Sequence, residues 1–277
     1  MAALSSAEAE RFRSFERRRH DEMAQSYHDF FSPITLHAIA PMLKAVRLAR
    51  GQRLLDVASG PGALAAAAAQ AGARAVGTDL SPKMVELAAR TYPDVEFRVA
   101  EVEHLPFADG AFDAVACNFG IGHFPNPEAS VAECMRVLKC GGHMALAWWE
   151  APDKQRVQGL FREAIAEIGA KPPPDVPVGN SMLRFTDAGE LRKLLEDTGL
   201  TGVVLEGITI THVVPDIETL WCGGLGSMAV TASAVTNQDA TTQAAIRGAF
   251  ERRAAAYKAG KGLALPVSFR IASGSKP

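Results

Sequence analysis

The 277-residue chain has few of the features that mark secreted, metal-binding or nucleic-acid-binding proteins. Its four cysteines, Cys117, Cys134, Cys140 and Cys222, show neither CxxC spacing nor an accompanying histidine pattern. We therefore expect reduced, buried thiols and no metal site. The net charge of −2 excludes the broad basic surface that nucleic-acid binding requires. The one basic cluster, residues 17–19, is surrounded by acids and predicts a solvated helix face.

Long apolar stretches are also lacking. No segment approaches the roughly 20 apolar residues that span a bilayer, and the start of the chain has no apolar core of signal-peptide length. Acids among the first 25 residues argue against an organelle transit peptide. We therefore expect a cytoplasmic protein with no membrane or nucleic-acid partner. The length allows one large domain, or one domain with a cap.

Apolar runs alternate with helical patterns from residue 53 to residue 149. Expected strands are 53–57, 75–79, 95–99, 114–117 and 143–149, and the expected helices between them are 64–71, 82–90 and 127–138. Alternation at this spacing implies right-handed crossovers and a mostly parallel sheet. The predicted fold class is α/β, with a doubly wound, Rossmann-like sheet of seven strands in which the last strand is antiparallel.

Helical segments flank this core on both sides. Residues 1–50 are helical in character, and we expect them to form an N-terminal arm on a core that covers residues 51–277. Two further strands are predicted at 205–214 and 265–272. If these two strands pair as antiparallel neighbours, roughly 50 residues are inserted between them. An insertion of that length usually has a function, so we interpret it as a cap over the edge of the sheet where a ligand would bind. The predicted cap segments are 151–185 and 216–263.

The most informative segment is Asp56-Val-Ala-Ser-Gly-Pro-Gly62, where an apolar run ends in an acid followed by a glycine turn. The next apolar run ends in Asp79. A glycine turn lets a cofactor approach bare backbone, and the second acid can accept from a pair of ribose hydroxyls. The pattern predicts a nucleoside cofactor. Residues 60–65 also fit the G-x-G-x-x-A fingerprint of nicotinamide dehydrogenases, which leaves that alternative open here.

Five ordered motifs resemble the class I S-adenosylmethionine-dependent methyltransferases, in particular their type 11 small-molecule group. In order they are Asp56–Gly62, Gly77–Ser81, Glu101-Val-Glu-His-Leu-Pro-Phe107, Phe112–Val115 running into Cys117–Gly120, and Arg136–Gly142. Together, in this order, the motifs are far more specific than any one of them. Ala58 replaces a glycine common in the first motif and Cys140 replaces a proline common in the last. Alanine is small and Cys140 lies at a turn, so both departures should be tolerated.

The resemblance implies S-adenosylmethionine as cofactor and S-adenosylhomocysteine as product. Gly60 and Gly62 would let the methionine part approach the backbone, and Asp56 would orient this loop or reach the amino group through water. Asp79 would hold both ribose hydroxyls, and Glu101 would accept from the adenine amine. The other residues that the resemblance places at the cofactor are Tyr27, Phe31, Ala58, Ser59, Leu80, Met84, Val102, Asn118, Phe119 and Gly120.

Two residues are candidates for the transfer step. Methyl transfer is an in-line displacement, so the protein must align nucleophile, carbon and sulfur, and it needs a base only for a weakly acidic nucleophile. His123 follows the fourth strand at the carboxyl edge of the sheet, and it is the candidate base; the alternative is a histidine that lines the pocket. Tyr27, on the arm, either closes over the methyl end of the cofactor or packs in the core.

We therefore predict an enzyme that transfers a methyl group from S-adenosylmethionine to oxygen, carbon or nitrogen of a small, apolar metabolite. One alternative is a regulatory protein that binds the cofactor without transferring the methyl group. The weaker alternative is the NAD-dependent dehydrogenase. A homodimer is left open, and no motif identifies the methyl acceptor.

Overall fold

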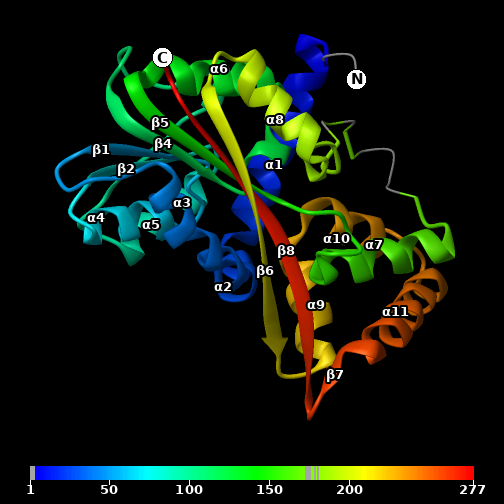
Figure 1. The fold of residues 1–277 in the computed structure, drawn as a ribbon. Helices are drawn as coiled ribbons and strands as arrows, with labels where there is room; N and C mark the ends of the chain where they lie inside the picture. Colours follow the sequence, from blue (N-terminus) through cyan, green and yellow to red (C-terminus); the bar gives the residue numbers. More distant parts are fainter. Residues whose placement is uncertain (1–3, 172–175, 178, 180) are drawn as a thin grey trace.

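One twisted sheet runs through the molecule with helices packed around it (Figure 1). The computed structural model describes residues 4–171, 176–177, 179 and 181–277. The strands are β1 (Arg53–Val57), β2 (Arg74–Asp79), β3 (Glu96–Val99), β4 (Phe112–Asn118), β5 (Leu138–Trp149), β6 (Thr201–Val214), β7 (Lys258–Ala259) and β8 (Gly262–Ser275). Their order is β3-β2-β1-β4-β5-β8-β6, and the short β7 pairs with β8 at the side of this path.

The strand directions confirm the predicted fold class. The pairs β2–β3, β1–β2, β1–β4 and β4–β5 are all parallel. The last long strand, β8, runs antiparallel to both of its neighbours, β5 and β6. β1 and β4 lie in the middle of the sheet and are buried on both faces, which is why they read as continuous apolar runs rather than as alternating ones.

Helices α4 (Ala63–Gln70) and α5 (Pro82–Thr91) follow the first two strands. α4 begins after Gly62, whose φ of +87° is left-handed, and a Cβ at Gly62 would lie 2.5 Å from the Phe97 ring. Only glycine meets both constraints without strain. α5 begins at Ser81, whose hydroxyl accepts from the Met84 amide at 3.1 Å. Both helices therefore start directly at the carboxyl edge of the sheet.

The N-terminal arm consists of α1 (Ser6–Ser26), a single π-helical turn over Tyr27–Phe31, α2 (Ser32–Thr35) and α3 (Ile39–Ala45). Asp21 of α1 accepts from the Ser81 hydroxyl at 2.6 Å and from the Lys83 amide at 3.1 Å. This carboxylate sits at the N-terminus of α5, where the helix dipole favours a negative charge. The contact places α1 across the edge of the sheet where the parallel strands end.

β6 and β8 form an antiparallel pair that extends to Val214 opposite Leu263, and the segment between these residues holds α9 (Ile217–Ser227), α10 (Ala229–Thr236) and α11 (Ala240–Ala254). α7 (Arg156–Ile168) joins them through Phe161, which stacks on Trp221 at 5.3 Å and packs against Phe250 at 4.5 Å between ring centroids. The two cap segments thus share one aromatic cluster. The expected segment 151–185 includes residues 172–175, 178 and 180, which lie outside the described part of the chain.

The remaining helices, α6 (Pro127–Val137) and α8 (Ala188–Asp197), pack beside each other and against the sheet. Among the described residues, no helix is both long and apolar enough to cross a bilayer. All four cysteines are free thiols. Cys117 and Cys134 are buried as predicted, whereas the prediction is wrong for Cys140 and Cys222, which are exposed. Cys140 lies in an exposed stretch of β5, and Cys222 lies on the solvent side of α9, so neither faces the core.

Two helical glycines are expected to respond to alanine with opposite signs. A Cβ at Gly159 in α7 would lie 2.0 Å from the Pro152 carbonyl oxygen, which is backbone and cannot swing away. Gly159→Ala should therefore lower the free energy of unfolding by about 1–3 kcal/mol. At Gly248 in α11 the nearest atom is the flexible Arg252 Nη1 at 3.6 Å, so Gly248→Ala should raise it by roughly 0.5–1 kcal/mol. Urea unfolding measures both variants, and equal changes would contradict this packing.

Candidate active site

A cleft of about 850 Å³, partly open to solvent, lies where β1, β2 and β4 end and α1 crosses the sheet. We call it the main cleft. Twelve residues singled out from the sequence line it, namely Tyr27, Ala58, Gly60, Asp79, Leu80, Met84, Glu101, Val102, Asn118, Phe119, Gly120 and His123. Four do not, namely Phe31, Asp56, Ser59 and Gly62. Sequence reasoning missed the residues that α1 contributes, which are Arg13, Glu16, Arg17 and His20.

Asp79, at the end of β2, forms a hydrogen bond with the loop that follows β1. Its Oδ2 accepts from the Gly60 amide at 2.8 Å and its Oδ1 from the Ser81 amide at 2.9 Å. Burial raises the pKa of Asp79, and the two backbone donors together with His20 and His123 oppose that rise. Each carboxylate oxygen retains a second lone pair, and Asp79 lines the main cleft. Asp79 can therefore accept from a pair of ligand hydroxyls, as the cofactor's ribose requires.

The loop between β1 and α4 has left-handed backbone at Ala58, with φ of +54°, and at Gly60, with φ of +50°. A Cβ at Gly60 would meet nothing within 4 Å, so this face of the loop is open toward the cleft. The left-handed conformation at Ala58, where the family motif that this segment resembles commonly has glycine, costs a non-glycine residue about 1 kcal/mol. Phe119, after β4, is also left-handed, with φ of +62°. Strained backbone of this kind gathers at binding sites.

Asp56 lies behind the cleft wall and has no exposed surface. Its Oδ2 accepts from the Ala65 amide at 3.0 Å in the first turn of α4, whereas its Oδ1 has no hydrogen-bond partner among the described residues. Burial raises the pKa of Asp56 to about 8. Ser59 Oγ is likewise buried without a described partner. The structure thus ties Asp56 to the first turn of α4, and its role toward the cofactor stays a prediction.

Glu101 faces an arginine from the arm. Arg13 Nε of α1 forms an ion pair with Glu101 Oε1, and Arg13 Nη2 lies 3.7 Å from Glu103. Burial raises the pKa of Glu101, and Arg13 opposes this rise. The resemblance assigns Glu101 to the adenine amine. An adenine at this position would have to share the carboxylate with Arg13 or displace the arginine.

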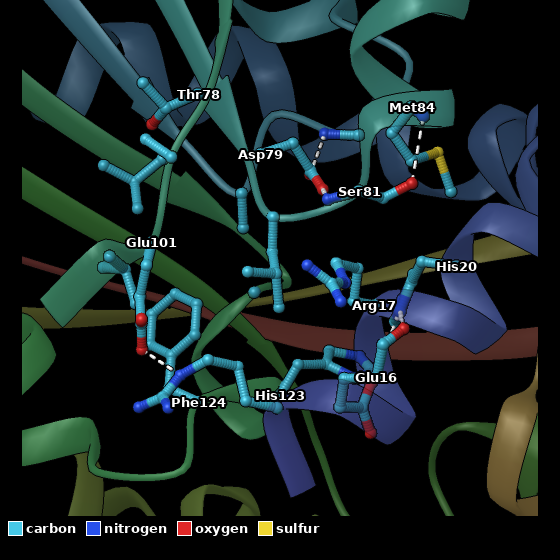
Figure 2. A pocket seen from close by; sticks show the side chains of 18 of the residues that line it. Glu16, Arg17, His20, Thr78, Asp79, Ser81, Met84, Glu101, His123 and Phe124 are labelled. Atoms are coloured by element: carbon cyan, nitrogen blue, oxygen red, sulfur yellow. Dashed lines mark hydrogen bonds and ion pairs between the residues drawn. The ribbon is translucent and has the colours of Figure 1, made fainter. Parts of the chain in front are cut away.

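Two histidines converge on one buried carboxylate. Figure 2 shows Glu16, His20 and His123 gathered across the cleft from Asp79. Glu16 is 2% exposed, and its Oε2 lies 3.0 Å from His123 Nδ1 and 3.4 Å from His20 Nδ1. Burial disfavours the charge, but His123, His20 and Arg19 outweigh it and lower the pKa of Glu16. The bond to Glu16 leaves His123 Nε2 as the nitrogen available to a ligand.

The same three residues could also hold a metal ion, because their candidate ligand atoms lie within 4.8 Å of one another. However, His20 Nδ1 also lies 2.8 Å from the Glu16 carbonyl oxygen, the geometry of a hydrogen bond within α1. A metal on that nitrogen would have to break this bond. The contacts of the cluster are therefore accounted for by hydrogen bonding. The i,i+4 spacing of Glu16 and His20 predicts that they share one helix face, but it does not connect them to His123.

A second cavity of about 600 Å³ adjoins the main cleft and shares Tyr27, Phe119, His20 and His123 with it. Phe119 stacks on Trp149 with ring centroids 3.8 Å apart. Phe31 packs edge-on against the same indole at 5.6 Å and lines this cavity, rather than the main cleft where the sequence had placed it. The second cavity therefore has a flat aromatic wall next to the histidines.

Tyr27 lies between the main cleft and the second cavity, and it lines both of them. Its ring stacks on Phe31 with centroids 5.6 Å apart. Burial, and secondarily the Asp79 charge, raises the pKa of the Tyr27 hydroxyl well above its ordinary value. Tyr27 is therefore a neutral hydroxyl at physiological pH and cannot act as a base there. It can donate a hydrogen bond.

The raised pKa of Asp56 makes stability depend on pH. Between about pH 4 and pH 8 folded Asp56 holds a proton that the unfolded chain has lost, so the free energy of unfolding falls as pH rises through this window. Asp56→Asn cannot titrate and should flatten the fall by roughly 1–2 kcal/mol between pH 6 and pH 8. Thermal melts of both proteins at pH 6, 7 and 8 measure this, and parallel curves would show that Asp56 titrates normally.

Three comparisons with known proteins bear on this site. A family model described as a methyltransferase domain matches residues 55–146. A demethylmenaquinone methyltransferase of Paenarthrobacter aurescens is 30% identical over 167 residues, which cover 57% of this chain and 66% of that protein. Another, from Beutenbergia cavernae, is 35% identical over 175 residues, which cover 60% of this chain and 73% of that protein.

Among solved structures, a phosphoethanolamine N-methyltransferase of Haemonchus contortus, in complex with phosphomonomethylethanolamine and S-adenosylhomocysteine, gives a TM-score of 0.59 at 18% identity. The alignment covers 96% of this chain and 60% of that one, and at this identity it shows a shared fold alone. The first curated relative is spanned over slightly less than two thirds of its length. With the relative from Beutenbergia cavernae matched over more than two thirds, this chain belongs to the class I S-adenosylmethionine-dependent methyltransferases.

Proposed function

We propose that this enzyme methylates a small, planar and largely apolar acceptor that binds in the second cavity. The observation that carries the proposal is the junction of the two hollows, where His20, His123, Tyr27 and Phe119 line both. A ligand in the second cavity would lie next to a cofactor in the main cleft, and both would contact these shared side chains. Membership of a methyltransferase family removes the support for the dehydrogenase alternative.

The residues of the main cleft fit S-adenosylmethionine. Asp79 has acceptor capacity for the ribose hydroxyls, Gly60 offers open backbone for the methionine part, and Glu101 offers a carboxylate for the adenine amine. Asn118 Oδ1 is buried without a partner among the described residues and can accept from a ligand. The bound cofactor supplies an electrophilic methyl group on a sulfonium. These assignments follow the family resemblance, and binding measurements must test them.

His123 is the proposed general base. His123 Nε2 would take the proton from an acceptor hydroxyl, amine or acidic carbon that receives the methyl group, with the carbon–sulfur bond broken and S-adenosylhomocysteine as the leaving group. Its Nδ1 would remain bonded to Glu16, which holds the ring orientation and stabilises the imidazolium that results. The neutral Tyr27 hydroxyl would position the acceptor and help to exclude water.

The aromatic wall supports a planar acceptor. Phe119 and Trp149, which stack on each other, both line the cavity, and Trp148, with its indole N–H bonded to the Met182 carbonyl at 3.2 Å, forms a further side. The curated relatives are named for demethylmenaquinone, whose name describes a quinone, and this agrees with a flat ring at that wall. The helical cap that closes the cavity from α9 and α10 would have to open for an acceptor to enter. A cytoplasmic location, the lack of a nucleic-acid partner and a homodimer remain predictions.

Calorimetry tests the cofactor assignment. Wild-type protein should bind S-adenosylhomocysteine, and Asp79→Asn should weaken that binding by at least tenfold, because one of the ribose acceptors becomes a donor. Asp109→Asn is the matched control, since the Asp109 side chain is 82% exposed and, among the described residues, pairs with Arg136 alone. Its affinity should match wild type. No binding of the nucleoside by folded wild-type protein would remove the proposed function.

Transfer assays test the base. Incubation with methyl-labelled S-adenosylmethionine and a panel of planar phenols or cell extract should yield a labelled product. His123→Gln should reduce the rate at least a hundredfold, which is typical of a lost general base, while the affinity for S-adenosylhomocysteine stays within about threefold. A variant with full activity would leave His123 as a lining residue. Binding without any labelled product would support the regulatory alternative.

A further inference from the structure

Helix α7 directs three polar side chains toward the hollow beside Trp148 and Trp149. Gln155, the N-cap, and Gln158 and Arg162 follow one another at spacings of three and four residues, so they share one face of the helix. Gln158 and Arg162 line the second cavity. All three line a small, partly open hollow that shares both tryptophans with the second cavity. We call Gln155, Gln158 and Arg162 the α7 donor cluster.

The donors of this cluster are unused among the described residues. Gln155 is 1% exposed, and its Nε2 has no hydrogen-bond partner there. Its side-chain oxygen Oε1 already accepts a hydrogen bond from the backbone amide of Gln158 at 2.7 Å. Arg162 forms no hydrogen bond or ion pair with any described residue, and burial alone lowers the pKa of its guanidinium. A half-buried, unpaired guanidinium is costly, and an unpaired buried amide adds to that cost.

The acceptors around this hollow are used by other groups. Glu150 is the acidic residue that lines it, and it is already shared by two cations. Its Oε1 accepts from Arg270 at 2.8 Å, and its Oε2 lies 2.9 Å from Lys154 Nζ. The Met182 carbonyl accepts from the Trp148 indole. The hollow therefore has donors in excess and no spare carboxylate among the described residues, which is the electrostatic complement of an anion.

We propose that the α7 donor cluster binds a carboxylate carried by the methyl acceptor. The planar part of the acceptor would lie along Trp148 and Trp149, and its reacting atom would point toward His123. An arginine fork and two amides suit a group with two oxygens, because Arg162 can bind them in parallel. This inference rests on the proposed function and narrows its substrate class from apolar acceptors to amphipathic acids. A cationic acceptor would be repelled by Arg162.

A matched pair of ligands tests the charge requirement. 3-Hydroxy-2-naphthoate and 3-hydroxy-2-naphthamide share one ring system and one hydroxyl and differ in the charged group. With saturating S-adenosylhomocysteine, wild-type protein should bind the acid at least tenfold more tightly than the amide. Quenching of tryptophan fluorescence reports binding, because Trp148 and Trp149 form the wall of the site, and calorimetry confirms the affinities.

Variants test which side chain supplies the charge. Arg162→Met should weaken binding of the acid at least tenfold and leave the amide within about threefold. Arg252→Met is the matched control, since it removes the same charge from an exposed guanidinium that pairs with Glu167 of α7. It should bind both ligands as wild type does. Arg162→Met should also melt at the wild-type temperature or above it, because an unpaired half-buried charge is lost; a purely structural arginine would lower that temperature.

The outcomes separate this inference from the function on which it rests. If S-adenosylhomocysteine binds but acid and amide bind equally, the anion site is wrong and the methyltransferase assignment stands. Equal losses of both ligands in Arg162→Met would likewise overturn it, since they would indicate a collapsed cavity. If S-adenosylhomocysteine binds and neither naphthalene binds at millimolar concentration, the planar acceptor and the anion site both fall. Failure to bind the nucleoside removes the proposed function itself.

Discussion

Two backbone amides that converge on the Asp79 carboxylate hold the site together. The Gly60 amide comes from the loop after β1 and the Ser81 amide from the start of α5, so one side chain joins both crossovers at the carboxyl edge of the sheet. Asp21 from α1 then bonds to the same turn through Ser81. These bonds hold the loop in its left-handed conformation, and the main cleft lies beside this loop.

Two further buried charges, on Glu16 and Arg162, differ in whether neighbouring groups offset their burial. Glu16 keeps its charge inside the protein because two histidines and a nearby arginine offset the burial, and one of those histidines belongs to the β4 edge of the sheet. Arg162 is the opposite case, since no described group offsets its burial. Buried polar groups of this kind cost stability unless a ligand completes them. Glu16 lines the main cleft and has its partners, whereas Arg162 lines the second cavity, where the proposed acceptor would complete it.

The strand periodicity predicted the sheet well where burial controls the residues. The expected strand 53–57 coincides with β1, because a central parallel strand is apolar throughout. The predictions were too short at the other edge, where β6 and β8 extend to Thr201 and Ser275. In these strands the backbone hydrogen bonds between β6 and β8 continue beyond the residues whose polar and apolar side chains alternate. β5 similarly begins at Leu138, whereas the expected strand began at residue 143.

The sequence by itself determined the α/β fold class, the nucleoside-binding edge and most residues of the main cleft, because local motifs carry that information over short separations. Tertiary structure alone decided the second half of the site. Glu16 and His123 are 107 residues apart, and only the docking of α1 brings them within 3.0 Å. Arg162 is a second example, because only the fold shows that its guanidinium is partly buried without a pairing partner among the described residues.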